Sequence, residues 1–122
     1  MSLSALCMGI AGLAASFAPQ ELITHLGAAP DSSTVLLVQA MGALYLGFAI
    51  LNWMARNILI GGIYARPVAL GNFLHFGIVS LAGWKAVAAG AITARFALLP
   101  CGIYTFFAIW FGLVLFTHPR RD

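Results

Sequence analysis

Five polar side chains stand in apolar stretches of the sequence and are the residues best placed to do chemistry. Tyr45, Asn52 and Arg56 fall within roughly 60° of one another on a helix and form one polar stripe. Asn72 and His75, three residues apart, share a face of the next apolar segment. In an antiparallel hairpin with about 1.5 Å of rise per residue, Asn52 and Asn72 have similar depths, as do Tyr45 and His75. The two stripes are therefore predicted to be able to face each other.

Two interpretations of the stripes are open. In one, they line a cavity that binds an anionic or amphiphilic molecule, such as a lipid headgroup or a quinone, with Arg56 holding the polar head. The histidine and the amides would then orient the ligand. In the other, the amides and the histidine make ordinary hydrogen bonds between helices, at about 0.6 kcal/mol each. Arg56 and Arg66 would in that case anchor helix ends to headgroups.

Catalysis and metal binding have less support. No acidic residue falls within an apolar segment, and a hydrolase needs a base that a third group orients. The histidines are predicted at three depths: His25 in the outer loop, His75 in the membrane and His118 at the inner end. Cys7 and Cys101 are each most simply a small buried hydrophobe. We predict a non-enzymatic protein with no catalytic residues, no metal site and no cofactor.

The composition determines the class of protein. The 122 residues are 62% hydrophobic and 7% charged, against roughly 45–50% and about 25% in soluble domains. A soluble fold of this size could not bury so much apolar surface, which indicates an integral membrane protein. The net charge of +3 is scattered along the chain, whereas nucleic-acid binders gather their basic residues on one face. Nucleic acid is therefore excluded as a partner, and membrane lipids are expected.

Four apolar runs are candidates for membrane spans, which need about 20 residues each. They are residues 2–18, 34–55, 67–86 and 96–116. The fold class predicted is all-α, an integral membrane four-helix bundle formed by a single domain, residues 1–122.

The first run is short, which tilt or local thinning of the bilayer can accommodate. Its end, "ASFA", resembles a signal-peptide cleavage site, but the first 18 residues hold no basic residue and Pro19 follows the site.

The connecting segments carry recognisable helix signals. "PQELITHLG" predicts a short helix in the membrane interface that ends at Gly27. "APDSST" predicts a turn with an N-cap residue before the second span. Pro67 suits the start of the third span, and Pro100 lies in the first turns of the fourth. Gly61 and Gly62 are expected to break the helix between the second and third spans.

The loops predict an orientation with both termini in the cytoplasm. The cytoplasmic side would then hold four basic residues: Arg56, Arg66, Arg120 and Arg121. The other side would hold two, Lys85 and Arg95, beside Glu21 and Asp31.

Small residues predict close helix packing. Gly12 and Ser16 on the first span, and Ala43 and Gly47 on the second, are pairs four residues apart that let backbones approach. They favour packing within the bundle over an interface with a partner subunit.

The first half of the chain resembles small uncharacterised bacterial inner-membrane proteins that are loosely DoxX-like. The resemblance rests on "GLAASFAPQELITHLG", with Phe17, Ala18 and Pro19 ending the first helix, and on "GALYLG", Gly42 to Gly47. It implies a four-helix bundle in the bacterial cytoplasmic membrane, an unassigned function and, by loose analogy, accessory roles near membrane redox complexes.

We therefore predict an accessory or structural subunit of a larger membrane complex, with other membrane protein subunits or further copies of itself as partners. The alternative function is a binder or carrier of a small amphiphile through the polar stripes. A homo-oligomeric channel or transporter is least favoured, because polar residues are few.

Overall fold

The computed structural model describes residues 1–58 and 62–117, and for residues 94–96 the backbone alone. The described residues form helices and no strands. The chain divides into two compact units, Met1–Arg56 and a second that begins at Asn57, and each is described by itself. Gly61, His118, Arg120 and Arg121, which the sequence predictions used, lie outside the described residues.

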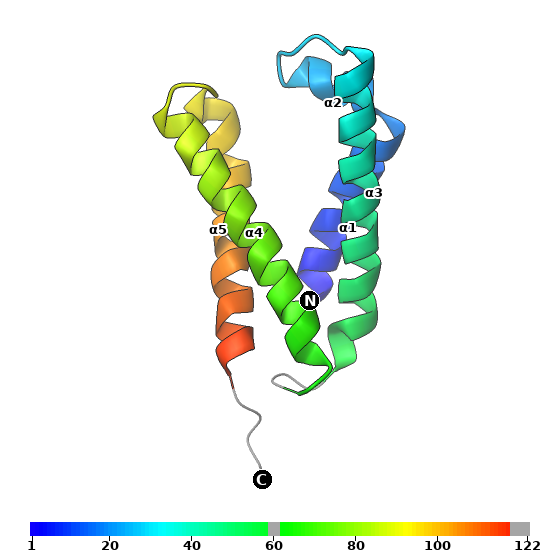
Figure 1. Ribbon diagram of the computed structural model, residues 1–122, viewed down its shortest axis with the longest axis vertical. Helices are drawn as coiled ribbons and strands as arrows, with labels where there is room; N and C mark the ends of the chain where they lie inside the picture. Colours follow the sequence, from blue (N-terminus) through cyan, green and yellow to red (C-terminus); the bar gives the residue numbers. More distant parts are fainter. Residues whose placement is uncertain (59–61, 118–122) are drawn as a thin grey trace. The chain divides into compact units, whose positions relative to one another are not determined.

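The first unit is a helical hairpin with a short helix at its turn (Figure 1). Helix α1 spans Ser2–Phe17, α2 spans Pro19–His25, and α3 spans Ser32–Met54 before one turn of 3-10 helix at Ala55–Asn57. The first two apolar runs, 2–18 and 34–55, were thus predicted to within about two residues. The short helix expected after the first run is also present.

Proline causes the sharp bend between α1 and α2, which amounts to 103°. Pro19 has no N–H to continue the helical hydrogen bonds, and its ring disfavours a helical conformation for the residue before it. Ala18 accordingly leaves the helix at φ −130° and ψ 50°. Pro19 occupies the first turn of α2, where its missing N–H costs nothing.

Local capping determines the C-terminal end of α2 and the start of α3. Gly27 has a φ of 82°, and the N–H groups of Gly27 and Ala28 reach back to carbonyl oxygens of α2 at 3.0 and 3.1 Å. These are the two hydrogen bonds of a Schellman motif, which favours glycine at this position. Asp31 is the N-cap of α3, since one carboxylate oxygen accepts from the Thr34 N–H at 2.9 Å.

A glycine seam joins α1 to α3. A Cβ at Gly12 would lie 2.9 Å from the backbone nitrogen of Leu46, and a Cβ at Gly42 would lie 2.7 Å from that of Ser16. The two backbones are therefore too close for any side chain at either glycine. The predicted pair on α1, Gly12 and Ser16, takes part in this seam. On α3 the contact is made by Gly42, while Gly47 has open space around it.

The second unit is a hairpin of two long helices (Figure 1). Helix α4 spans Ala65–Ala88 and α5 spans Ala94–Phe116, against predicted spans of 67–86 and 96–116. Gly90, at a φ of 69°, ends α4 in a second Schellman motif. Pro100 lies inside α5, within its first two turns as predicted.

Aromatic side chains form the core of the second unit. Phe76 on α4 is buried, and its ring centroid lies 5.1 Å from that of Tyr104, 4.9 Å from Phe107 and 5.9 Å from Phe111. These are ordinary separations for interacting aromatic rings. At another level, Gly83 leaves room for the thiol of Cys101, which would lie 2.5 Å from a Cβ there. The contacts order α4 and α5 as an antiparallel pair.

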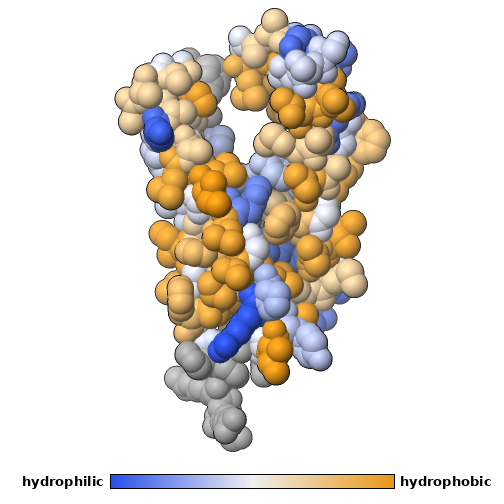
Figure 2. All heavy atoms as spheres, in the orientation of Figure 1, coloured by the Kyte–Doolittle hydropathy of each residue, from blue (hydrophilic) through white to orange (hydrophobic). Residues whose placement is uncertain are grey.

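The outer faces of the helices are apolar. Many large hydrophobic side chains are exposed on every long helix, and Figure 2 shows hydrophobic residues covering most of the visible helix surfaces. Three stretches are long and apolar enough to cross a membrane: Ser32–Asn57, Ala65–Ala88 and Ala97–Phe116. Helix α1 meets the criteria only together with α2, across their bend. The protein is thus all-helical in its described part and has the features of a multi-pass membrane protein.

Candidate functional site

The three residues of the polar stripe predicted in the first unit differ in their burial. Tyr45 is half-buried, Asn52 is fully buried and Arg56 is exposed. The Asn52 side-chain amide donates to the sulfur of Met8 on α1 at 3.9 Å, so it takes part in joining the two helices.

Arg56 lies at the end of α3, in the 3-10 turn, rather than within a long helix. Its Nη1 donates to the backbone carbonyl of Trp53 at 2.7 Å, and its guanidinium carbon lies 4.3 Å from the centroid of the Trp53 ring. This is a cation–π contact at an exposed site. The guanidinium therefore lies against the indole ring of Trp53. That Arg56 anchors the helix end to lipid headgroups remains a prediction.

The stripe predicted in the second unit lies on α4. Asn72 is fully buried, and its side-chain amide donates to the Val68 carbonyl one turn earlier at 2.8 Å. His75 is half-buried, with its ring 5.2 Å from that of Phe76 and 5.7 Å from that of Tyr104. Both residues therefore belong to the packed part of their own hairpin.

The five candidate residues fall in two different units. Tyr45, Asn52 and Arg56 belong to the first, and Asn72 and His75 to the second. Each unit is described by itself, so a cavity between the two stripes stays a prediction.

Sequence reasoning missed a polar network within the second unit. The Thr105 hydroxyl donates to the Cys101 carbonyl at 2.7 Å, so its oxygen is left to accept from other groups. Trp84 donates to that oxygen through its indole N–H at 3.0 Å, and the Ser80 hydroxyl lies 2.7 Å away. Ser80 must be the donor in its pair, because the only Thr105 hydrogen is already used. One oxygen thus joins α4 to α5.

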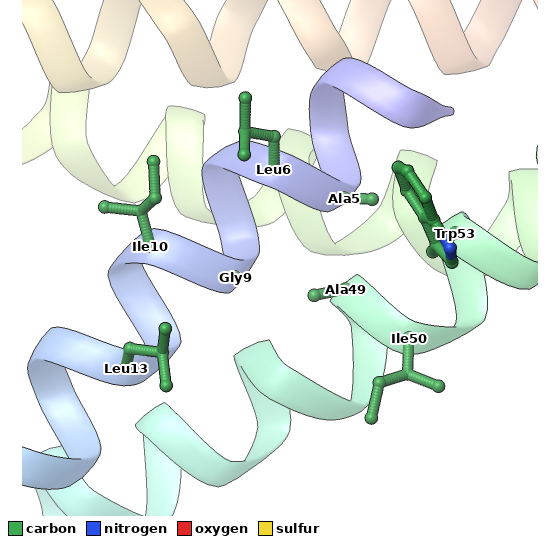
Figure 3. A pocket seen from close by; sticks show the side chains of 8 residues that line it. All are labelled: Ala5, Leu6, Gly9, Ile10, Leu13, Ala49, Ile50 and Trp53. Carbon is green, nitrogen blue, oxygen red and sulfur yellow. The ribbon is translucent and has the colours of Figure 1, made fainter.

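The apolar residues of the first unit also form a feature that the sequence analysis did not predict. An open groove of about 440 Å³ lies between α1 and α3 (Figure 3). Its lining is wholly apolar apart from the indole nitrogen of one tryptophan and consists of Ala5, Leu6, Gly9, Ile10, Leu13, Ala49, Ile50 and Trp53. Hydropathy does not distinguish residues that line a groove from residues that pack against a neighbouring helix. The small residues Gly9 and Ala49 at its base are the only signal, and they are common in this chain.

The titratable groups of the described residues do not gather at one place. Among these residues, no group of three or more His, Cys, Asp or Glu side chains could hold a metal ion. Cys7 and Cys101 are both free thiols, the first half-buried and the second buried.

Comparisons with protein-family models, with curated proteins and with solved structures find no match for this chain. The resemblance to the DoxX-like group therefore stays a prediction.

Proposed function

We propose that this protein is a non-enzymatic accessory or structural subunit of a larger assembly in the bacterial cytoplasmic membrane. Its two hairpins form a four-helix bundle with both termini in the cytoplasm. The orientation is supported by the exposed Arg56 and Arg66 near the break between α3 and α4, because cytoplasmic loops are rich in arginine and lysine.

One face of α3 is the observation that carries the subunit proposal. Ala40, Ala43 and Gly47 follow one another at helical spacing, and all three are exposed. A Cβ at Gly47 would meet no atom within 4 Å. Small residues on an outer helix face allow another helix to approach its backbone closely, and the resulting van der Waals packing favours association of helices in lipid.

The polar side chains support the same role. Thr105 on α5 accepts from Ser80 and Trp84 on α4. Asn52 on α3 donates to Met8 on α1. These groups hold helices together within a hairpin, as in a structural membrane component.

Native mass spectrometry of the full chain, purified in a gentle detergent, tests this proposal. We expect a complex with another membrane protein or a second copy of the chain. Gly47→Leu should abolish that complex, because the larger side chain holds the partner helix away. Gly102→Leu is the matched control, since Gly102 is also exposed with nothing within 4 Å of its Cβ position. A wild-type chain that is always a lone monomer would refute the subunit role.

A further inference from the structure

The groove of the first unit has the dimensions of one lipid chain in one leaflet. From Leu13 to Ala5 its α1 wall covers nine residues, whose eight rises make about 12 Å of helix. One leaflet of hydrocarbon is about half of a core roughly 30 Å thick. Leu6, Ile10 and Ile50 are exposed along the walls, so the groove is open to the surroundings of the helices (Figure 3).

We expect one end of the groove at headgroup depth. Trp53 closes this end, next to Ala5 in Figure 3, and stands in the last turn of α3. Because α3 is long enough to cross the membrane, its last turn belongs near the interface, where tryptophan is enriched. The groove therefore runs from the interface into the hydrocarbon.

A cation stands at that same end. The guanidinium of Arg56 lies over the Trp53 ring, and Arg56 is exposed. A guanidinium has five N–H donors, and the Trp53 carbonyl accepts from one of its nitrogens, Nη1. The remaining donors can form charge-assisted hydrogen bonds with a phosphate.

The nearest described acids are far from this cation. Asp31 caps the other end of α3, about 35 Å away along the helix axis, and Glu21 lies on α2, which contacts α1 and α3 near that other end. The groove end at Trp53 is thus positively charged and favours an anionic group.

We propose that this groove binds an anionic phospholipid, with one acyl chain between α1 and α3 and the headgroup phosphate on Arg56. The walls are apolar apart from the indole nitrogen of Trp53, which suits a hydrocarbon chain. The indole ring of Trp53 lines the groove and also contacts the guanidinium, so the two parts of the site meet at this residue. The site lies within the first unit and is independent of any partner subunit.

Lipid titration of the full-length protein in native mass spectrometry tests the headgroup contact. The probes are phosphatidylglycerol and phosphatidylcholine with identical chains, and glycerol phosphate without chains. Arg56→Gln should weaken phosphatidylglycerol binding about fivefold, the effect of one arginine near an anionic headgroup. Phosphatidylcholine should lose less, because its choline cation offsets the charge of its phosphate. Arg56→Lys should retain most of the preference. Arg66→Gln, at another exposed arginine, is the control for a general effect of charge.

The same titration tests the groove. Gly9→Leu fills its base and should weaken binding of both phospholipids, whereas Gly102→Leu, which adds the same side chain to an open surface, should change neither. Ile10→Trp, at an exposed wall position, fills the groove without altering the base and serves where Gly9→Leu does not fold. Far-UV circular dichroism checks that each variant is folded.

Three results would overturn the proposal. The first is an equal loss of phosphatidylglycerol binding in Arg56→Gln and Arg66→Gln, which would mean general attraction of anionic lipid. The second is unchanged binding in a folded groove-filling variant. The third is binding of glycerol phosphate as tight as that of phosphatidylglycerol, which would mean that no chain occupies the groove.

Discussion

The glycine seam between α1 and α3 allows a quantitative test. In Gly42→Ala, the new Cβ would lie 2.5 Å from the Ser16 hydroxyl oxygen, 2.7 Å from the Ser16 nitrogen and 3.0 Å from the Ala15 carbonyl carbon. The hydroxyl can rotate away, but the two backbone atoms cannot move without displacing α1. Overpacking of this kind costs about 1–3 kcal/mol.

Gly47→Ala is the matched control for this test. Both glycines lie inside α3, so both substitutions gain the same higher helix propensity of alanine, about 1 kcal/mol in soluble helices. The Cβ at position 47 would have no atom within 4 Å. The difference in unfolding free energy between the two variants therefore isolates the contact, and we expect Gly42→Ala to be less stable than Gly47→Ala by about 1–3 kcal/mol.

Reversible unfolding of the full chain in mixed micelles, followed by far-UV circular dichroism, measures this difference. Adding Ser16→Gly to Gly42→Ala should restore only part of the stability, because it removes the hydroxyl and leaves the backbone contact. Equal stabilities of Gly42→Ala and Gly47→Ala would show that the backbones do not approach as described. Complete recovery with Ser16→Gly would show that the hydroxyl alone limits the approach.

Two further predictions concern the other polar contacts. Thr105→Val removes the acceptor of two hydrogen bonds between α4 and α5 and should destabilise the chain by about 1 kcal/mol, measured in the same unfolding assay. Thr117→Val, which loses only a bond to its own helix, should have little effect, and equal losses would contradict the network. Hydrogen bonds from Thr34 and Ser33 lower the pKa of Asp31 to about 2, so its cap strengthens α3 fully above the ordinary pKa of 3.8 and is lost as pH falls through about 2. The Thr34 amide proton shift should titrate with that midpoint and be flat in Asp31→Asn, whereas a midpoint near 3.8 would contradict the cap.

Local signals in the sequence predicted the elements well. The ends of α3, α4 and α5 follow from where apolar runs stop, since burial in lipid requires length and apolarity and little else. The bend before Pro19 and the αL position of Gly27 follow from backbone sterics, which depend on one or two residues. Asp31 was one of several possible caps, and only the structure distinguishes it from Ser32 and Ser33.

Relations between helices were harder to predict. Gly42 and Gly47 are both glycines in the same apolar helix, so the sequence does not distinguish them. The rotation of α3 about its axis decides which of them contacts α1. Thr105 gave no signal, because a threonine in an apolar helix commonly bonds its own backbone, as Thr117 does. The juxtaposition of Asn52 and Arg56 with Asn72 and His75 depends on the arrangement of the two hairpins and is still a prediction.

The glycine seam also determines which substitutions the chain can accumulate. Every replacement of a glycine introduces a Cβ, so no substitution of Gly12 or Gly42 avoids the contact with the other helix. In a saturation mutagenesis screen these two positions should be depleted for all substitutions, including alanine and serine. Gly47, five residues along the same helix, should accept these two small residues, because a Cβ there meets no atom within 4 Å. Drift of this sequence over time is therefore expected to leave Gly12 and Gly42 unchanged.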